Sequence, residues 1–103
     1  MGSDNSWFKP QLTADITLHF TEKGGRSGPI LSGRRYGCPY KFDPGDFTGW
    51  DGWIFPSEDF APGETKRLGI YFLSKEIAAV FRLQPKFYLW EGRIIGEAVP
   101  ISN

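Results

Sequence analysis

A glycine-rich segment with three arginines is the part of this sequence best suited to binding an anion. The run Gly24–Pro29 contains Arg26, and Arg34 and Arg35 follow a few residues later. Glycine and proline at this density exclude a helix interior or a central strand, so we expect an exposed loop. Guanidinium groups and glycine amides in such a loop can contact phosphate oxygens without reading a base. The residue types therefore predict a binding loop.

The sequence offers little for catalysis. Its one histidine, His19, falls on an expected strand, and its one cysteine, Cys38, lies between a glycine and a proline. A Cys–His pair across two strands could activate a nucleophile, but a half-buried structural cysteine is the ordinary alternative. The loop Gly24–Gly28 lacks the Gly-Lys-Ser/Thr ending of a phosphate-binding loop and precedes no expected helix. We therefore expect no enzyme activity and no nucleotide cofactor.

The acidic run Asp43–Asp51 resembles a cation loop only at first sight. It lacks the alternating acids or amides of a calcium loop and the glutamate at the twelfth position, and its Pro44-Gly45 step is typical of a turn. We therefore expect a structural turn in this run, with no metal.

A single cysteine cannot form an internal disulfide or anchor zinc by itself, which fits a reducing cytosol. The sequence therefore predicts no metal site and no other cofactor.

Length and composition predict one all-β domain. The chain has 103 residues, enough for a single core, and nine Phe, four Trp and four Tyr to fill and flank it. Thirteen Gly and eight Pro interrupt the chain too often for long helices. No apolar run approaches the roughly 20 residues of a membrane span, and no signal-peptide pattern precedes the domain. We therefore expect a soluble, cytoplasmic protein with no membrane partner.

Short strands follow from the alternation of apolar and polar residues. Apolar side chains occupy every second position in Asp15–Phe20, Arg67–Phe72 and Lys86–Trp90, the pattern of strands with one buried face. This pattern places Phe20 on the buried face and His19 on the wet one. Weaker strands are expected near Pro39–Phe42, Trp50–Phe55 and Arg93–Ile101. Six or seven strands with frequent turns indicate a sandwich or a barrel.

Several turn sequences, taken in order, resemble those of the C-terminal β-barrel, the third domain, of bacterial translation elongation factor Tu. That domain has a first strand, a GGR-x-x-P turn, a G-Y-R-P-Q-F-like segment, a short strand ending in proline, a P-G-D corner and a final E-G-G-R-x-x-G hairpin. The matching segments here are Ala14–Phe20, Gly24–Pro29, Gly33–Phe42, Gly52–Pro56, Pro62–Glu64 and Glu91–Gly96. The resemblance covers roughly residues 12 to 101.

The resemblance implies a closed antiparallel β-barrel of about six strands over residues 12–103, preceded by an N-terminal tail over 1–11. Closure would remove the exposed sheet edges that a small β domain must otherwise protect. Ser74–Phe81 is the one segment with helical character, because Ser74 could cap it and Glu76 would favour its N-terminal end. The segment is short, however, and the family has an extended connection there.

The resemblance also implies specific RNA contacts. The third domain of elongation factor Tu touches the T-stem backbone of aminoacyl-tRNA, and three of its contact positions match Arg26, Lys75 and Gly92 here. Two other contact positions differ, since they hold Ser27 and Gly37. The expected phosphate-binding residues, with the neighbouring arginines added, are Arg26, Arg34, Arg35, Lys75, Gly92 and Arg93.

The zero net charge hides two segregated blocks. The segment Lys23–Phe42 has basic residues and no acid, whereas Asp43–Glu64 has acids and no base. Neighbouring strands could pair the blocks on a solvated face, or the blocks could form separate surfaces for an anion and for a cationic partner. The elongation factor's third domain also docks proteins, and tryptophans suit such a face. The candidates are Trp50, Trp53 and Trp90, although burial in the core is the ordinary alternative, above all for Trp53.

Two functions follow from the sequence. The first is a protein-docking module that imitates the elongation factor's third domain and binds the factor, a regulator or a toxin of the translation machinery. The second is a weak, sequence-independent binder of tRNA or other RNA through the basic residues. Zero net charge favours the first, since a dedicated RNA binder is usually basic, and the arginine-rich loop favours the second.

Overall fold

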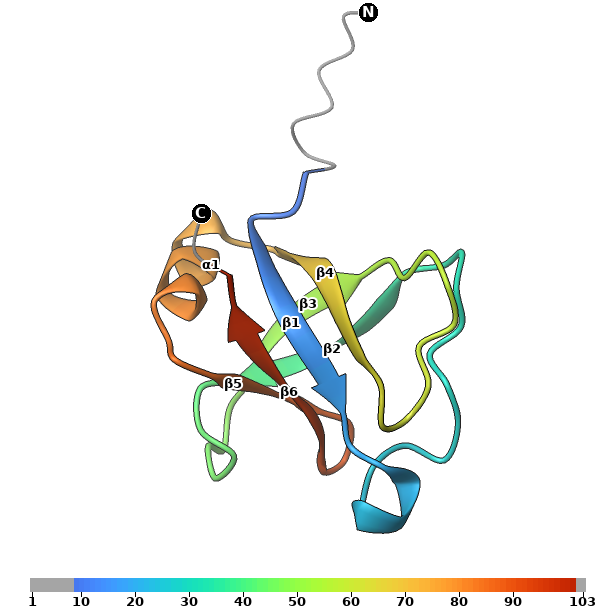
Figure 1. The fold of residues 1–103 in the computed structure, drawn as a ribbon. Coiled ribbons are helices and arrows are strands. Elements are labelled where there is room, and N and C mark those ends of the chain that lie inside the picture. Colours follow the sequence, from blue (N-terminus) through green and yellow to red (C-terminus); the bar gives the residue numbers. More distant parts are fainter. Residues whose placement is uncertain (1–8, 102–103) are drawn as a thin grey trace, which may run out of the picture.

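Six antiparallel strands close into a barrel (Figure 1). The structure, a computed structural model, describes residues 9–101. The strands are β1 (Leu12–Leu18), β2 (Tyr36–Lys41), β3 (Trp50–Ile54), β4 (Thr65–Phe72), β5 (Phe87–Trp90) and β6 (Ile94–Pro100). Their order around the barrel is β1-β4-β3-β2-β5-β6, and β6 pairs with β1 to close it. The expected closed all-β barrel is confirmed, while positions 1–8 of the expected tail lie outside the described residues.

Alternating side chains build the core as the sequence predicts. The four even-numbered residues of β1 are buried, and the odd-numbered ones are only partly covered. Aromatic residues fill the barrel interior, where the ring of Tyr40 meets Phe72 and Phe87 edge-on. One expectation is wrong. Phe20 is 56% exposed because β1 ends at Leu18 and the chain then turns into a short 3-10 helix, η2 (Thr21–Lys23).

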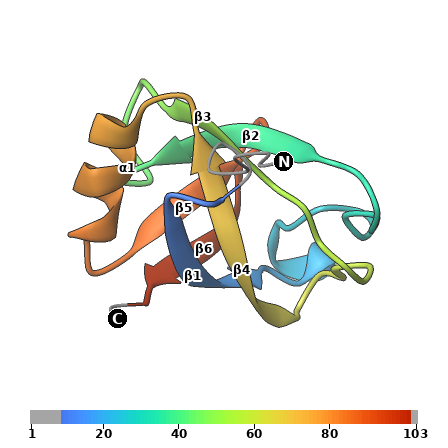
Figure 2. The same cartoon turned by 90° about the horizontal axis from the view of Figure 1, so that it is seen from above.

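The segment expected to be extended by resemblance is instead a helix, α1 (Lys75–Arg82). The Ser74 side chain caps it by accepting hydrogen bonds from the amides of Glu76 and Ile77. The helix buries Phe81, whose ring stacks on Phe42 and Phe72 and also meets Phe87. The cap and the apolar face therefore stabilise a helix where the family has an extended connection. Helix α1 covers one end of the barrel, away from the loops around η2 (Figure 2).

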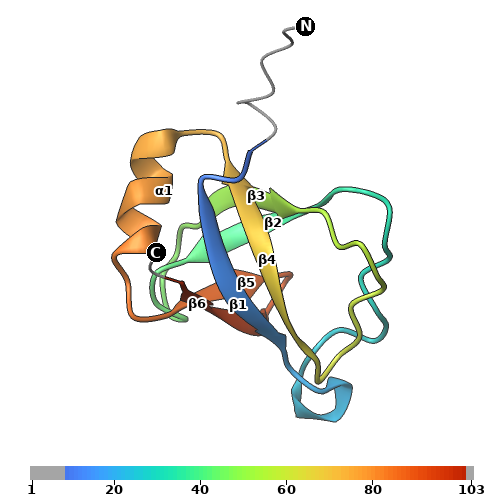
Figure 3. The same cartoon turned by 45° about the horizontal axis from the view of Figure 1, so that its top comes forward.

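Strands β2 and β3 form a pair that is joined weakly to the rest of the barrel. They share five register pairs with each other, but β3 shares only two with β4, and β2 only two with β5. The loops before β2 and after β3 extend beyond the barrel together and meet in an isolated bridge between Ile30 and Phe60. Figure 3 shows these loops on the side opposite α1. Both candidate sites described below lie on this β2–β3 pair and its loops.

Candidate functional site

Three of the expected phosphate-binding residues line one hollow. Arg26, Arg34 and Arg35 surround a space of about 200 Å³ together with Tyr36 and the segment 29–31. Arg34 and Arg35 are exposed, and neither forms an ion pair with any of residues 9–101. The loop therefore presents two guanidinium groups to solvent beside a third, as an anion-binding loop requires.

Arg26 is used inside the protein. Its Nη1 donates to Glu91 Oε2 at 3.3 Å, and its Nε donates to the carbonyl of Gly28 at 3.3 Å. Tyr36 donates its hydroxyl to the same Glu91 oxygen, and the Arg26 guanidinium lies 5.1 Å from the centre of the Tyr36 ring. Burial, followed by the hydrogen bond to Glu91, raises the pKa of Tyr36 far above its ordinary value. Arg26 thus ties the loop to the β5–β6 turn and has fewer donors left for a phosphate.

Arg93 makes the reciprocal contact from the β5–β6 turn. Its Nε and Nη2 donate to the carbonyls of Gly24 and Gly25 at 2.7 and 3.0 Å. Gly92 lies in the same turn with a φ of 73°, a left-handed conformation that favours glycine. Lys75 is exposed at the start of α1, so it lies at the other end of the barrel from these residues (Figure 1). The six expected RNA contacts therefore do not form a single surface.

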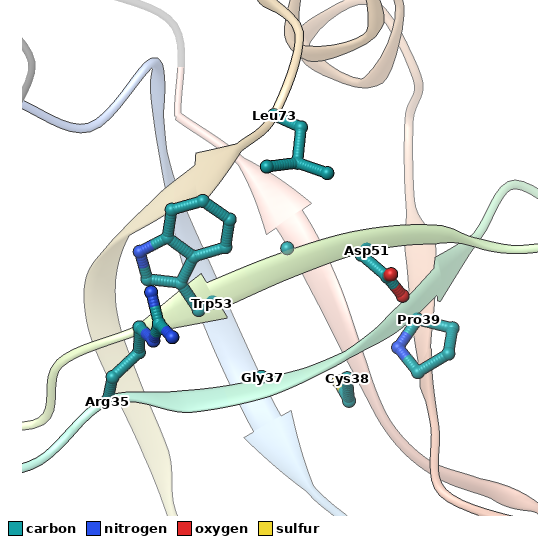
Figure 4. Close-up of a pocket in the computed structure, with 8 residues that line it drawn as sticks. Arg35, Gly37, Cys38, Pro39, Asp51, Trp53 and Leu73 are labelled. Carbon is teal, nitrogen blue, oxygen red and sulfur yellow. The ribbon is translucent and has the colours of Figure 1, made fainter.

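A larger hollow lies on the outer face of β2 and β3, and we call it the β3 groove. Its volume is about 580 Å³, and its walls are Arg35, Pro39, Asp51, Trp53 and Leu73, with Gly37 between Arg35 and Pro39. Inward residues such as Cys38 alternate with these positions, so the groove follows from the period of two along each strand. Figure 4 shows Arg35 beside the Trp53 ring, with Asp51 and Pro39 farther along the strands.

A row of stacked groups begins with Arg35 and Trp53 in the wall of the β3 groove and extends beyond it to Tyr71 and Phe55. The Arg35 guanidinium lies 5.2 Å from the centre of the Trp53 ring, and Trp53 stacks on Tyr71 at 6.2 Å with an interplanar angle of 9°. Phe55 meets Tyr71 edge-on at 5.7 Å and is 52% exposed. Trp53 is therefore not a core residue, which corrects the alternative that placed it inside the barrel. Each such contact stabilises this row of side chains, because cation–π and aromatic pairs contribute free energy beyond that of their buried area.

A second hollow of about 330 Å³ continues the β3 groove toward α1. It shares Asp51 and Leu73 with the groove and adds Trp50 and Ile77. Leu73 is 81% exposed and Trp50 is 42% exposed, so two large apolar side chains face solvent beside the hollows. Trp90, the third tryptophan expected on a docking face, lies on β5 under the Lys41 ammonium and lines neither hollow.

The two charge blocks do not pair with each other. The ion pairs found within residues 9–101 are Arg26–Glu91, Lys66–Glu58, Arg67–Asp15 and Lys86–Glu97. None of them joins a base of Lys23–Phe42 to an acid of Asp43–Glu64. Hydrogen bonds between the two segments include one from Lys41 Nζ to the backbone carbonyl of Asp46 at 2.7 Å and one from the Ser32 amide to Asp59 Oδ1 at 2.9 Å. The blocks therefore form no ion pair with each other, although Arg35 of one and Asp51 of the other line the same hollow.

The residues considered for catalysis are separated. Cys38 is buried, and this burial raises the pKa of its thiol to about 12, so the thiol stays protonated at neutral pH. His19 lines a different hollow from Cys38. Within the described part of the chain, no three of His, Cys, Asp and Glu gather where a metal could bind. No helix among residues 9–101 is long and apolar enough to cross a membrane.

Sequence reasoning missed the residues that open the groove. Leu73 follows a strand and carries no signal of its own. Tyr71, which stacks on Trp53 behind the groove, is predicted only as part of a strand. Gly37 was noted as a departure from the family pattern, although its lack of a side chain leaves the groove open. The outward positions of Gly37 and Trp53 were not predicted, and the pairing of β3 with β4 that brings Tyr71 directly beside Trp53 is not visible in sequence.

The geometry defines a small β-barrel with two surfaces suited to binding, an arginine-lined hollow and an aromatic groove. Comparison with models of protein families and with curated proteins finds no match to this chain. The chemistry of these two surfaces is therefore the basis on which its function is inferred.

Proposed function

We propose that this protein is a non-catalytic docking module that binds another protein through the β3 groove. The observation that carries the proposal is the exposure of Leu73 and Trp50 around two adjoining hollows on one face, with the exposed Phe55 packed against Tyr71 nearby. Large apolar side chains that gather on a monomer's surface mark interaction sites, and tryptophan is enriched where binding energy concentrates. Arg35 and Asp51 supply a polar rim of the kind that surrounds such a centre.

The resemblance to the third domain of elongation factor Tu directs the search for a partner to the translation machinery. The elongation factor itself, one of its regulators or a toxin that targets it are the proteins to test first. A module of this kind needs no cofactor, and it would act in the cytoplasm. The buried, protonated Cys38 thiol supports a role without covalent chemistry.

Two leucines with matched exposure allow a direct test. Leu73 beside the groove is 81% exposed, and Leu83 at the far end of α1 is 82% exposed. A photo-reactive amino acid is placed at one position or the other, and the protein is irradiated in living bacterial cells. We expect protein adducts from position 73 that are absent from position 83, with the partner identified by mass spectrometry. Equal adducts from both positions, or none from position 73, would overturn the proposal.

A second candidate function is weak binding of an RNA phosphate backbone at the arginine-lined hollow. The specific support is the gathering of Arg26, Arg34 and Arg35 around one small space. Two or three phosphate contacts give low, salt-sensitive affinity and no sequence preference. The internal contacts of Arg26 and Arg93 reduce the number of available donors, so we place this function second.

Titration with bulk tRNA at two salt concentrations tests the second candidate. RNA binding through this hollow requires affinity that falls steeply with salt and is lost in the Arg34→Ala/Arg35→Ala variant. Lys75→Ala is the matched control, because Lys75 is a basic residue at the opposite end of the barrel. Absence of binding at low salt removes RNA as a ligand, and an equal loss in the control removes the arginine-lined hollow as its site.

A further inference from the structure

Gly37 is a strand glycine that the fold does not require. Of the other glycines inside strands, a Cβ at Gly52 would lie 2.9 Å from two aromatic rings, one at Gly69 2.5 Å from a proline ring, and one at Gly96 2.7 Å from a carbonyl oxygen. At Gly37 the nearest atom would be 3.6 Å away, an ordinary contact, and its φ is not positive. Packing therefore explains the other three glycines, and neither packing nor backbone conformation gives a structural reason for Gly37.

The missing side chain at Gly37 has a clear effect on the surface. Gly37 is exposed, stands opposite Trp53 in the β2–β3 register and lines the β3 groove. A larger side chain there would fill the space between Arg35 and Pro39. Glycine inside a strand costs stability, and it often marks a place where a ligand or another backbone approaches closely. The open space over Gly37 thus indicates where a bound group enters.

Opposite charges stand at the two ends of the groove. Gly37 is level with Trp53, so Arg35 lies two residues from this level in one direction and Asp51 two residues in the other. Four residue steps along a strand span about 13 Å between the two backbone positions, and the Arg35 guanidinium reaches from its end toward the Trp53 ring. Neither Arg35 nor Asp51 forms an ion pair with any other residue that the structure describes. Both charges are therefore available to an occupant that lies along the groove.

We propose, on the basis of the docking function above, that the β3 groove binds an extended segment of the partner protein. The segment places an apolar side chain over Gly37, a carboxylate near Arg35 and a cationic group near Asp51. In an extended chain, alternate residues share one face, so positions i, i+2 and i+4 span the same 13 Å or so as the groove. A helix advances only about 6 Å over four residues and cannot meet both charges in this way. The pattern recognised is acidic–x–apolar–x–basic, in either chain direction.

Short blocked peptides test this pattern directly. The probe is glutamate–threonine–leucine–threonine–lysine, and the comparison peptides replace leucine by serine, or make both charged ends acidic or both basic. Binding is followed by amide and indole chemical shifts up to millimolar peptide. We expect shifts at Gly37 and Trp53, and affinity about two- to fivefold lower for each mismatched charge, as exposed ion pairs predict. Equal affinity for all peptides, or no shift at the highest concentration, would overturn the proposal.

Two variants separate recognition from folding. Gly37→Val adds a side chain suited to a strand where there is room for a Cβ, so it should fold, fill the groove and abolish the shifts. Arg35→Glu leaves the groove open and should shift the preference to the peptide with two basic ends. Unchanged peptide binding in Gly37→Val, or an unchanged preference in Arg35→Glu, would contradict the proposal. Cross-linking at Leu73 without peptide discrimination would leave the docking function intact and remove only this account of its ligand.

Discussion

At the scale of single residues, the arginines of the loop before β2 and of the β5–β6 turn have two different uses. Arg26 and Arg93 fasten the loop and the β5–β6 turn to each other, one through Glu91 and the other through backbone carbonyls. Arg34 has no such partner among residues 9–101 and faces the hollow. The same residue type at similar spacing thus supports the fold at one position and is available for a ligand at another. Sequence spacing alone does not distinguish the two uses.

The Glu91 carboxylate is the centre of this fastening, and its removal should loosen it. Glu91→Ala leaves the half-buried Tyr36 hydroxyl and the Arg26 guanidinium without their shared acceptor. We expect the free energy of unfolding to fall by about 1–2 kcal/mol, the usual cost of an unpaired, partly buried polar group. Urea denaturation measures it. Glu58→Ala, which breaks an exposed ion pair with Lys66, is the control and should change little. Equal effects from both variants would show that the Glu91 contacts contribute no more to the free energy of unfolding than an exposed ion pair does.

At the scale of elements, the sequence predicted the strands well, but it predicted helix α1 and the side-chain contacts between strands poorly. Alternation placed β1, β4 and β5 because each buries one face, and this local pattern survives in the fold. Helix α1 was not predicted with its full length, because the stability of so short a helix depends on the packing of Phe81 against aromatic rings that are distant in sequence. The outward position of Trp53 was missed for a related reason. On the outer face the Trp53 ring is covered by Tyr71, which is distant in sequence, and by Arg35, which belongs to a loop.

Helix α1 should depend measurably on its N-terminal cap. Ser74→Ala removes the side chain that accepts from the amides of Glu76 and Ile77, and loss of such a cap costs about 1 kcal/mol. We expect the lower stability to appear first as faster hydrogen exchange in α1. Ser57→Ala, in the exposed loop after β3, is a matched control with no cap to lose. Unchanged exchange in α1 would mean that packing of Phe81 alone holds the helix.

Strand β2 should make the protein sensitive to alkali. Burial raises the pKa of Cys38 from 9.0 to about 12, so above pH 9 the unfolded chain releases a proton that the folded state keeps. The stability that this group contributes is complete below pH 9, and the free energy of unfolding then falls by up to about 1.4 kcal/mol per pH unit until about pH 12. Burial also raises the pKa of Tyr40, which extends the loss above pH 10.

The Cys38→Ala variant isolates the first part of this loss. Urea unfolding between pH 7 and pH 10.5 should show a decline from about pH 9 in the natural protein and from about pH 10 in the variant. The comparison uses the shape of each curve, because the variant also changes stability at neutral pH. Identical profiles would mean that the Cys38 thiol ionises equally easily in the folded protein.

At the scale of the whole molecule, the strength of strand pairing around the barrel is uneven. Strand β1 shares six register pairs with β4 and five with β6, whereas the β2–β3 pair is held on each side by two. Side chains reinforce both weak junctions, since Trp53 on β3 stacks on Tyr71 of β4 and Tyr40 on β2 meets Phe87 of β5 edge-on. The candidate binding surfaces thus lie on the part of the barrel with the fewest backbone pairs to its neighbours.

This unevenness predicts that β2 and β3 open together before the barrel unfolds. Local opening breaks few register pairs at each junction, so amides of β2 and β3 should exchange at a lower free energy than those of β1. Native-state hydrogen exchange at increasing low denaturant concentrations measures both groups, with β1 as the internal reference. A peptide bound in the β3 groove should raise protection in β2 and β3 alone, because it stabilises the closed form. Equal exchange free energies for all six strands would contradict a separate opening of the β2–β3 pair, and the groove would then lie on a uniformly stable barrel.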